Sequence, residues 1–185
     1  MANWWYYYYC RGYDKDKKTY NNEDFALATN KVTPDFFNCK YEPVKCHLQI
    51  GQNIQVGSIV VLNTTIGKSN KKRFITGYFT VEEVGGSKPL GQTEGKSTCS
   101  PIIMDRNKSL LLLDNPIEID YKYASKLFSE ELNSWKKNSQ TLLQNISSKT
   151  RNSHLTTEQK RIIMSDLNVL YENGSKNYLG MNYVF

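Results

Sequence analysis

The clearest pattern of hydrophobic positions lies in the middle of the chain. The run Gly57-Ser58-Ile59-Val60-Val61-Leu62 is rich in β-branched residues, which favour an extended conformation. From Phe74 to Val84 apolar and polar residues alternate, which predicts a strand with Ile75, Phe79 and Val81 on one face. Residues 63–73, between the two runs, include four Lys or Arg. The pattern predicts an antiparallel pair of strands joined by a basic loop.

Several shorter segments also favour strands. Residues 3–10 read NWWYYYYC, and six consecutive aromatic residues are typical of a strand with large rings on both faces. Weaker apolar runs follow at 101–104, 110–113 and 116–119, and residues 25–32 fit a strand or a short helix equally well. The front half of the chain is therefore predicted to be mainly β.

The period of the pattern changes after Tyr123. Apolar residues recur at helical spacing up to Trp135, which predicts one amphipathic helix of about 13 residues. A second helix is expected from Thr156, because Thr156 and Gln159 fit a capping box and Gly174 fits a helix end. The prediction is one α+β domain over residues 1–185, a small curved β-barrel or sheet with two or more helices at its side and a helical part at about 121–174.

Composition narrows the class of protein. No apolar run reaches eighteen residues, so no membrane partner is expected, and residues 1–5 lack the features of a secretory signal, which points to a cytoplasmic protein. The four cysteines are then expected to be free thiols. Cys39, Cys46 and His47 do not have the spacing of a structural zinc site. The sequence predicts no metal and no cofactor.

Signatures of catalysis are weak. Residues 91–97 read GQTEGKS, with one residue too few between the glycines for a phosphate-binding P-loop, and Pro101 follows almost at once. The two histidines, His47 and His154, have no evident partners in the sequence. No set of residues indicates a catalytic site.

The basic charge is concentrated in two segments. The chain has 24 Lys and Arg against 18 Asp and Glu, a net charge of +6. Residues 63–110 carry eight basic and four acidic residues, a net of +4, and residues 135–161 carry six and one, a net of +5. Basic surfaces bind phosphates through counterion release, so DNA or RNA is the expected partner. The predicted phosphate contacts are Lys68, Lys71, Lys72, Arg73, Lys149 and Arg151.

The aromatic first strand suggests a pocket for a base. Successive side chains of a strand alternate faces, so half of these rings are expected to point away from the core that the other half fills. Rings beside basic loops can stack on bases or surround a methylated base. The candidate residues are Trp4, Trp5, Tyr7 and Tyr9, with Trp135 as a further ring and Asp105 and Asn107 as groups that read a base edge.

The order of these segments resembles the PUA-like superfamily, specifically its EVE/YTH and nucleotide-modification-associated branches. The resemblance rests on the aromatic first strand, on residues 56–61 (VGSIVV) with Ser58 in place of the usual acidic residue, and on residues 77–84 (GYFTVEEV). Residues 101–120 and the basic segment 149–152 are similar to the second branch. The resemblance implies a curved β-barrel that reads modified bases, often flipped into an aromatic pocket, without catalysis.

Three hypotheses for function follow. The first is a non-catalytic module that binds nucleic acid and recognises a modified base, for example a methylated one. The second is a small enzyme on nucleotides or nucleic acid, built on a PUA-like barrel. The third is a protein-interaction adaptor of a defence or phage system, because protein interfaces are also enriched in tyrosine and tryptophan.

Overall fold

A computed structural model describes residues 4–8, 13–14, 19–20, 40–41, 54–67, 70–84, 88–89, 98–99, 102–135, 141–150 and 153–179. The strands are β1 (Trp4–Tyr8), β2 (Tyr13–Asp14), β3 (Thr19–Tyr20), β4 (Lys40–Tyr41), β5 (Ile59–Ile66), β6 (Lys72–Val84), β7 (Lys88–Pro89), β8 (Thr98–Cys99), β9 (Ile102–Leu111) and β10 (Ile117–Glu118). The helices are α2 (Tyr121–Leu127), α3 (Ser129–Trp135), α4 (Leu142–Lys149) and α5 (Thr157–Glu172).

A mixed six-stranded sheet forms the centre of the fold. Its order is β1-β5-β6-β9-β4, and β10 pairs with the start of β6. Strand β1 runs parallel to β5, whereas β5, β6 and β9 are antiparallel neighbours. The predicted hairpin of β5 and β6 is therefore confirmed, as is a strand within residues 3–10. Among the described strands the sheet stays open, because β1 and β4 lie at opposite edges and do not pair.

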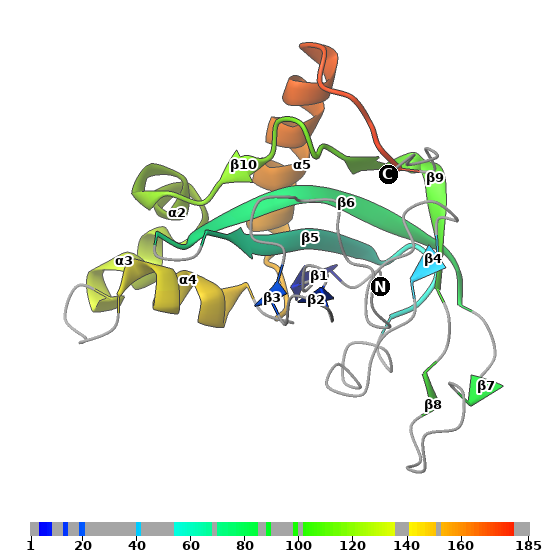
Figure 1. Ribbon diagram of the computed structural model, residues 1–185, viewed down its shortest axis with the longest axis horizontal. Helices are drawn as coiled ribbons and strands as arrows, with labels where there is room; N and C mark the ends of the chain where they lie inside the picture. Colours follow the sequence, from blue (N-terminus) through cyan, green and yellow to red (C-terminus); the bar gives the residue numbers. More distant parts are fainter. Residues whose placement is uncertain are drawn as a thin grey trace.

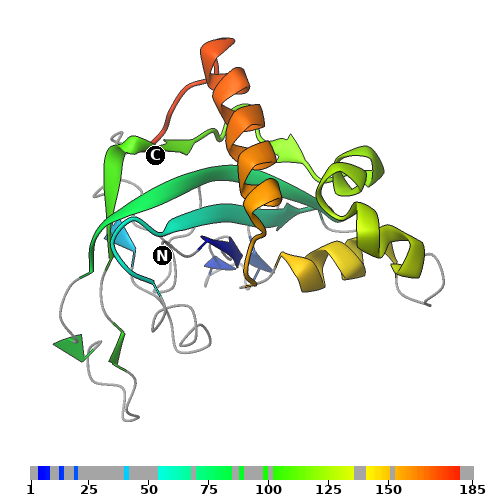
Figure 2. The ribbon, with the colours of Figure 1, turned by 180° about the vertical axis from the view of Figure 1, so that it is seen from behind.

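The helices cover one face and one end of this sheet. Helix α5 crosses the sheet, while α2, α3 and α4 gather beside the end where β6 begins (Figures 1 and 2). The capping box predicted for α5 is present, since the Thr156 hydroxyl accepts from the Gln159 amide and the Gln159 side chain accepts from the Thr156 amide. The backbone N–H of Tyr6 in β1 donates to the carbonyl of Ser153 at 2.7 Å, so the segment before α5 covers part of the β1 edge.

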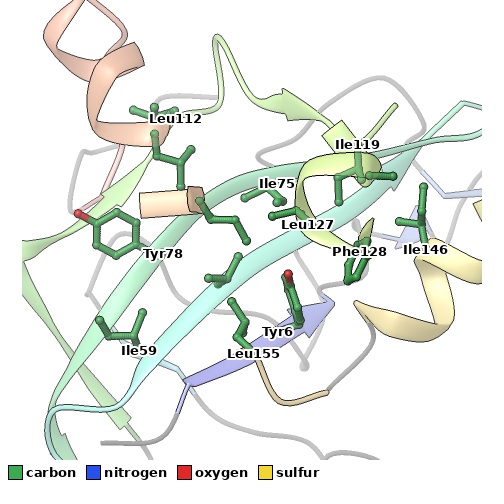
Figure 3. Close-up of a cluster of buried hydrophobic side chains, with 14 of the residues drawn as sticks. Tyr6, Ile59, Ile75, Tyr78, Leu112, Ile119, Leu127, Phe128, Ile146 and Leu155 are labelled. Atoms are coloured by element: carbon green, nitrogen blue, oxygen red, sulfur yellow. The ribbon is translucent and has the colours of Figure 1, made fainter. Parts of the chain in front are cut away.

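Both faces of the central strands are buried. The face toward the helices holds one cluster, in which Tyr6 of β1 and Ile75 of β6 pack with Phe128 and with residues of α4 and α5 (Figure 3). The opposite face holds a second cluster that includes Phe79 and Met104. Burial on two faces explains why residues 59–62 form a continuous apolar run instead of an alternating one.

Two details of the predicted elements are corrected. Ile75 does not share a face with Phe79 and Val81, because the register between β5 and β6 shifts after Leu62 and leaves Thr76 as an extra residue in β6. The single helix expected from 123 to 135 is two helices, α2 and α3, interrupted at Phe128, which caps the end of α2. Helix α4 lies within the predicted helical part at about 121–174, although the sequence pattern gave it no bounds of its own.

Candidate functional site

A cavity of about 390 Å³ opens between β9, α5 and the segment after α5. Its volume lies within the range of small-ligand pockets. The lining residues come from four places in the sequence and are mainly polar: Tyr78, Arg106, Asn107, Ser109, Leu110, Asn168, Tyr171, Asn177 and Leu179. We take this cavity, called the β9–α5 pocket below, as the candidate site.

A wide bulge in β9 builds one wall of the pocket. Tyr78 of β6 pairs with Leu110, but Thr80, two residues later, pairs with Asp105, five residues earlier in β9. Residues 106–109 therefore fall outside the regular register with β6, although Thr80 of β6 still donates to Ser109 Oγ and to the carbonyl of Lys108, and residues 106–108 are exposed. Bulges of this kind redirect side chains out of the regular alternation. Here the bulge brings Arg106 and Asn107 to the pocket.

Asp105 holds the bulge closed. Its carboxylate accepts from the backbone N–H of Asn107 at 3.0 Å and from the Lys108 ammonium at 2.9 Å. The hydrogen bond from Lys108 holds the pKa of the Asp105 carboxyl below its usual range. Asp105 does not line the pocket, and its role as a reader of a base edge stays a prediction, whereas Asn107, predicted for the same task, does line the pocket.

The second wall is one face of α5. Asn168 and Tyr171 are three residues apart, so both side chains lie on the same side of the helix. The Tyr78 hydroxyl donates to Asn168 Oδ1 at 3.3 Å, which links the helix to the sheet at the base of the pocket. In Figure 3 Tyr78 lies at one end of the buried cluster, with its hydroxyl directed away from the other labelled side chains.

The third wall is the segment that follows α5. Gly174 adopts a φ of 104°, the left-handed conformation that lets the chain turn back at the end of the helix. The side chain of Asn177 then fixes this segment to β9: Nδ2 donates to the carbonyl of Ser109 at 3.1 Å, and Oδ1 accepts from the amides of Leu111 and Leu179. The wall is thus held by side-chain hydrogen bonds to the backbone.

The described lining of the pocket combines a charged residue, carboxamides and an exposed aromatic residue. Arg106 supplies a positive charge, and the described residues that line the pocket include no Asp or Glu. Asn107 and Asn168 supply carboxamides, and residue Tyr171 is 48% exposed. Charge, hydrogen-bonding groups and an accessible aromatic face therefore meet in one place.

The structure places other predicted pocket residues elsewhere. Trp135 is 8% exposed and packs against Phe128 with ring centroids 5.4 Å apart, so it belongs to the hydrophobic core and not to a base-binding pocket. Tyr6 is buried in the same cluster. The side chains of Trp4, Trp5 and Tyr7, and the whole of Tyr9, lie outside the described residues, so the face that they occupy stays a prediction.

The six predicted phosphate contacts divide into three groups, which are three lysines at the surface, one buried arginine, and two residues outside the described part of the chain. Lys71 and Lys72 are exposed at the start of β6, and Lys72 pairs with Glu118 at 2.9 Å. Lys149 pairs with Glu131 at 3.2 Å. Arg73 is only 3% exposed, and its guanidinium is used inside the protein, so it is not a surface contact. Lys68 and Arg151 lie outside the described residues.

Arg73 instead ties β6 to the end of α4. Its Nε donates to Thr150 Oγ1 at 3.1 Å, its NH2 group donates to the carbonyl of Thr150 at 3.3 Å, and its NH1 group donates to Thr65 Oγ1 at 3.0 Å. Asn63 Nδ2 donates to the same carbonyl at 3.0 Å. Because Thr150 is the C-cap of α4, this network satisfies a helix end and places positive charge beside it.

Within the described ranges, no three His, Cys, Asp or Glu side chains lie close enough together to hold a metal ion. The side chains of the four cysteines lie outside those ranges, so their predicted thiol state is untested. No helix in the described part of the chain is both long and apolar enough to cross a membrane.

Of the residues that line the β9–α5 pocket, only Asn107 was predicted from the sequence as a pocket residue. Asn168 and Tyr171 are polar or aromatic residues on the exposed side of a helix, a signal that is visible only once the helix boundaries are known. No protein-family model matches the chain, and no curated protein matches it either.

Proposed function

We propose that the protein is a non-catalytic nucleic-acid-binding module that holds one unpaired base in the β9–α5 pocket. The observation that carries the proposal is that the half-exposed Tyr171 lines the same pocket as Arg106 and the carboxamides of Asn107 and Asn168. Proteins recognise single-stranded nucleic acid by stacking bases on aromatic or guanidinium planes and by hydrogen bonds to the base edges. All three kinds of group line this pocket.

The charge of the whole chain supports the same class of partner. The sequence pI is about 9.0, and among the described residues that line the pocket Arg106 is positively charged and none is negatively charged. A phosphate backbone is attracted to such a surface irrespective of sequence. The resemblance to PUA-like domains favours the same function, although the proposal does not require the sheet to close into a barrel.

Binding to a modified base is the finer part of the proposal. The predicted aromatic cage of Trp4, Trp5, Tyr7 and Tyr9 would supply that specificity, and the β9–α5 pocket does not depend on it. Oligonucleotides that carry methylated and unmodified bases, compared in one titration series, test this part separately.

The test of the main proposal is a pair of tyrosine variants. Tyr171→Ala is expected to weaken binding of a labelled single strand of about 12 nucleotides by about 5- to 140-fold, the range for loss of one stacked base. Tyr121→Ala is the matched control, because Tyr121 is 50% exposed but does not line the pocket. Fluorescence anisotropy measures both affinities, and thermal melting confirms that both variants fold.

Equal affinity of Tyr171→Ala and the unmodified protein would show that the pocket does not hold a base. An equal loss in both variants would mean that exposed tyrosines bind the strand without a defined site. Either result overturns the proposal.

A further inference from the structure

An asparagine–glycine pair stands at the end of α5. Asn173 is the C-cap of the helix, and Gly174 turns the chain back toward the β9–α5 pocket with a φ of 104°. Both residues are exposed, and no atom of the described residues, chain neighbours aside, lies within 4 Å of the position that a Cβ of Gly174 would take. The end of α5 projects beyond the sheet in two opposite views (Figures 1 and 2). Water therefore has open access to this turn.

This pair has the chemistry for spontaneous deamidation, which consumes one water and releases one ammonia. The backbone nitrogen of the residue after an asparagine loses its proton and attacks the side-chain Cγ, so that a new N–Cγ bond forms. The bond from Cγ to the side-chain nitrogen then breaks, ammonia leaves, and a succinimide ring remains. Water opens the ring at either carbonyl and leaves aspartate or isoaspartate. Glycine favours the attack because it has no Cβ to obstruct it and the widest range of backbone conformations.

Few contacts hold the turn in its folded conformation. Among the described residues, the carboxamide of Asn173 has no hydrogen-bond partner. The amide of Gly174 donates to the carbonyl of Tyr171 at 3.0 Å, and the amide of Ser175 donates to the carbonyl of Leu170 at 3.1 Å. The first of these bonds occupies the nitrogen that must react, so the reaction proceeds when the last turn opens. Opening costs least at exposed ends of elements, where local stability is lowest.

We propose that Asn173 is a site of spontaneous deamidation, and that the product weakens binding of a phosphate-bearing strand at the β9–α5 pocket. The second part rests on the proposed function. Either product carries a negative charge two residues from Tyr171, whereas the described lining of the pocket holds no Asp or Glu. That charge lies at the C-terminal end of α5, where the helix dipole is already negative, and it repels phosphates. Isoaspartate also lengthens the backbone by one methylene, at the start of the segment that Asn177 fixes to β9.

Peptide mapping by mass spectrometry tests the modification. The folded full chain is incubated at mildly alkaline pH and digested under acidic conditions, and the peptide with Asn173 is expected to gain the mass difference between an amide and an acid. Asn133 and Asn168 are internal controls, because both lie within helices and neither precedes a glycine. Asn173 is expected to react at least about 10-fold faster, which corresponds to a turn that opens about 1.4 kcal/mol more easily. In Asn173→Gln the ring would be larger, and the product is expected to be absent.

Two variants of Asn173 test the effect on binding. Asn173→Asp reproduces one product and is expected to weaken binding of a labelled single strand of about 12 nucleotides. The expected loss at low salt is up to about 5-fold, the effect of one like charge at about 4 Å in water, and it should shrink as added salt screens the repulsion. Asn173→Gln is the matched neutral control and is expected to bind as the original chain does. Fluorescence anisotropy measures the affinities, and thermal melting confirms that both variants fold.

The outcomes separate the two parts of the proposal from each other and from the proposed function. An Asn173 that reacts no faster than Asn133 overturns the modification. Equal affinities of Asn173→Asp and Asn173→Gln, together with a loss in Tyr171→Ala, overturn the effect on binding and leave the function standing. If Tyr171→Ala loses no affinity, the proposed function fails, and the mass measurement still decides whether Asn173 deamidates.

Discussion

At the scale of single residues, Arg73 shows how a basic residue in a basic segment can have a structural role. It follows Lys71 and Lys72 in sequence, but it alone of the three is buried and bonded to Thr65 and Thr150. Hydrogen bonds to a charged group contribute about 1.5–3 kcal/mol each. Arg73→Ala is therefore expected to lower the free energy of unfolding by at least about 2 kcal/mol. Urea denaturation followed by circular dichroism measures the change.

The control for Arg73 is its exposed neighbour. Lys71→Ala is expected to change the free energy of unfolding by less than about 0.5 kcal/mol, as for most surface substitutions. If the two variants were equally stable, the guanidinium network would contribute nothing to the fold.

The role of a single residue can be predicted from the sequence where its partners lie close to it along the chain. Thr156 and Gln159 can be identified as a capping box because both partners lie within four residues of each other. Asp105 and Asn107 stand out as polar residues between two short apolar runs, which the structure joins into the single strand β9, and their contacts depend on Lys108 and on the bulge. The burial of Arg73 depends on a residue 77 positions away, and that of Trp135 on tertiary packing, which no local pattern records.

At the scale of elements, the hairpin of β5 and β6 could be predicted because β-branched runs and alternation are strong signals. The bulge of β9 could not, because residues 106–109 carry no glycine or proline to mark it. The split between α2 and α3 was also hidden, since the apolar spacing from Ala124 to Trp135 fits one helix. Phe128 instead packs between Tyr6 and Trp135, with ring centroids 6.5 Å and 5.4 Å away, and tertiary packing decides the break.

Gly77 controls the contact between β6 and β9. A Cβ at this position would lie 2.1 Å from the carbonyl oxygen of Leu110 and 2.9 Å from the Cα of Leu111. Backbone atoms cannot move aside as a flexible side chain can, so β9 would have to shift. Gly77→Ala is expected to lower the free energy of unfolding by about 3 kcal/mol, the upper part of the range for overpacking.

Glu83→Ala provides the control for Gly77→Ala on the same strand. Glu83 is exposed, so its replacement is expected to change the free energy of unfolding by less than about 0.5 kcal/mol. Denaturant titration of both variants makes the comparison, and a stable Gly77→Ala protein would show that β6 and β9 can separate without cost.

At the scale of the whole molecule, the positive charge is partly neutralised by ion pairs across the surface. Lys126 pairs with Asp166 at 2.9 Å, in addition to the pairs of Lys72 and Lys149. Exposed pairs of this kind contribute little to stability. They do reduce the local positive charge that is available to bind a phosphate. Each pair leaves the net charge at +6, but the count of 24 Lys and Arg overstates the number of basic side chains that are available to phosphates.

The lysines at the start of β6 can be tested as phosphate contacts through salt dependence. Lys72 is six residues from Tyr78, about 20 Å along an extended strand, so phosphate binding there is separate from the β9–α5 pocket. The double variant Lys71→Ala/Lys72→Ala, with Arg73 left intact, is expected to weaken single strands of every sequence alike. The slope of log K against log salt should fall by about 0.7 for each phosphate that the double variant no longer binds. Lys126→Ala removes a lysine of α2 that is paired with Asp166, as Lys72 is paired with Glu118, and should leave the slope unchanged if phosphates bind at the start of β6. A slope that does not respond to the double variant would place the phosphate contacts elsewhere on the protein, while an altered preference among bases would show that this end of β6 also reads sequence.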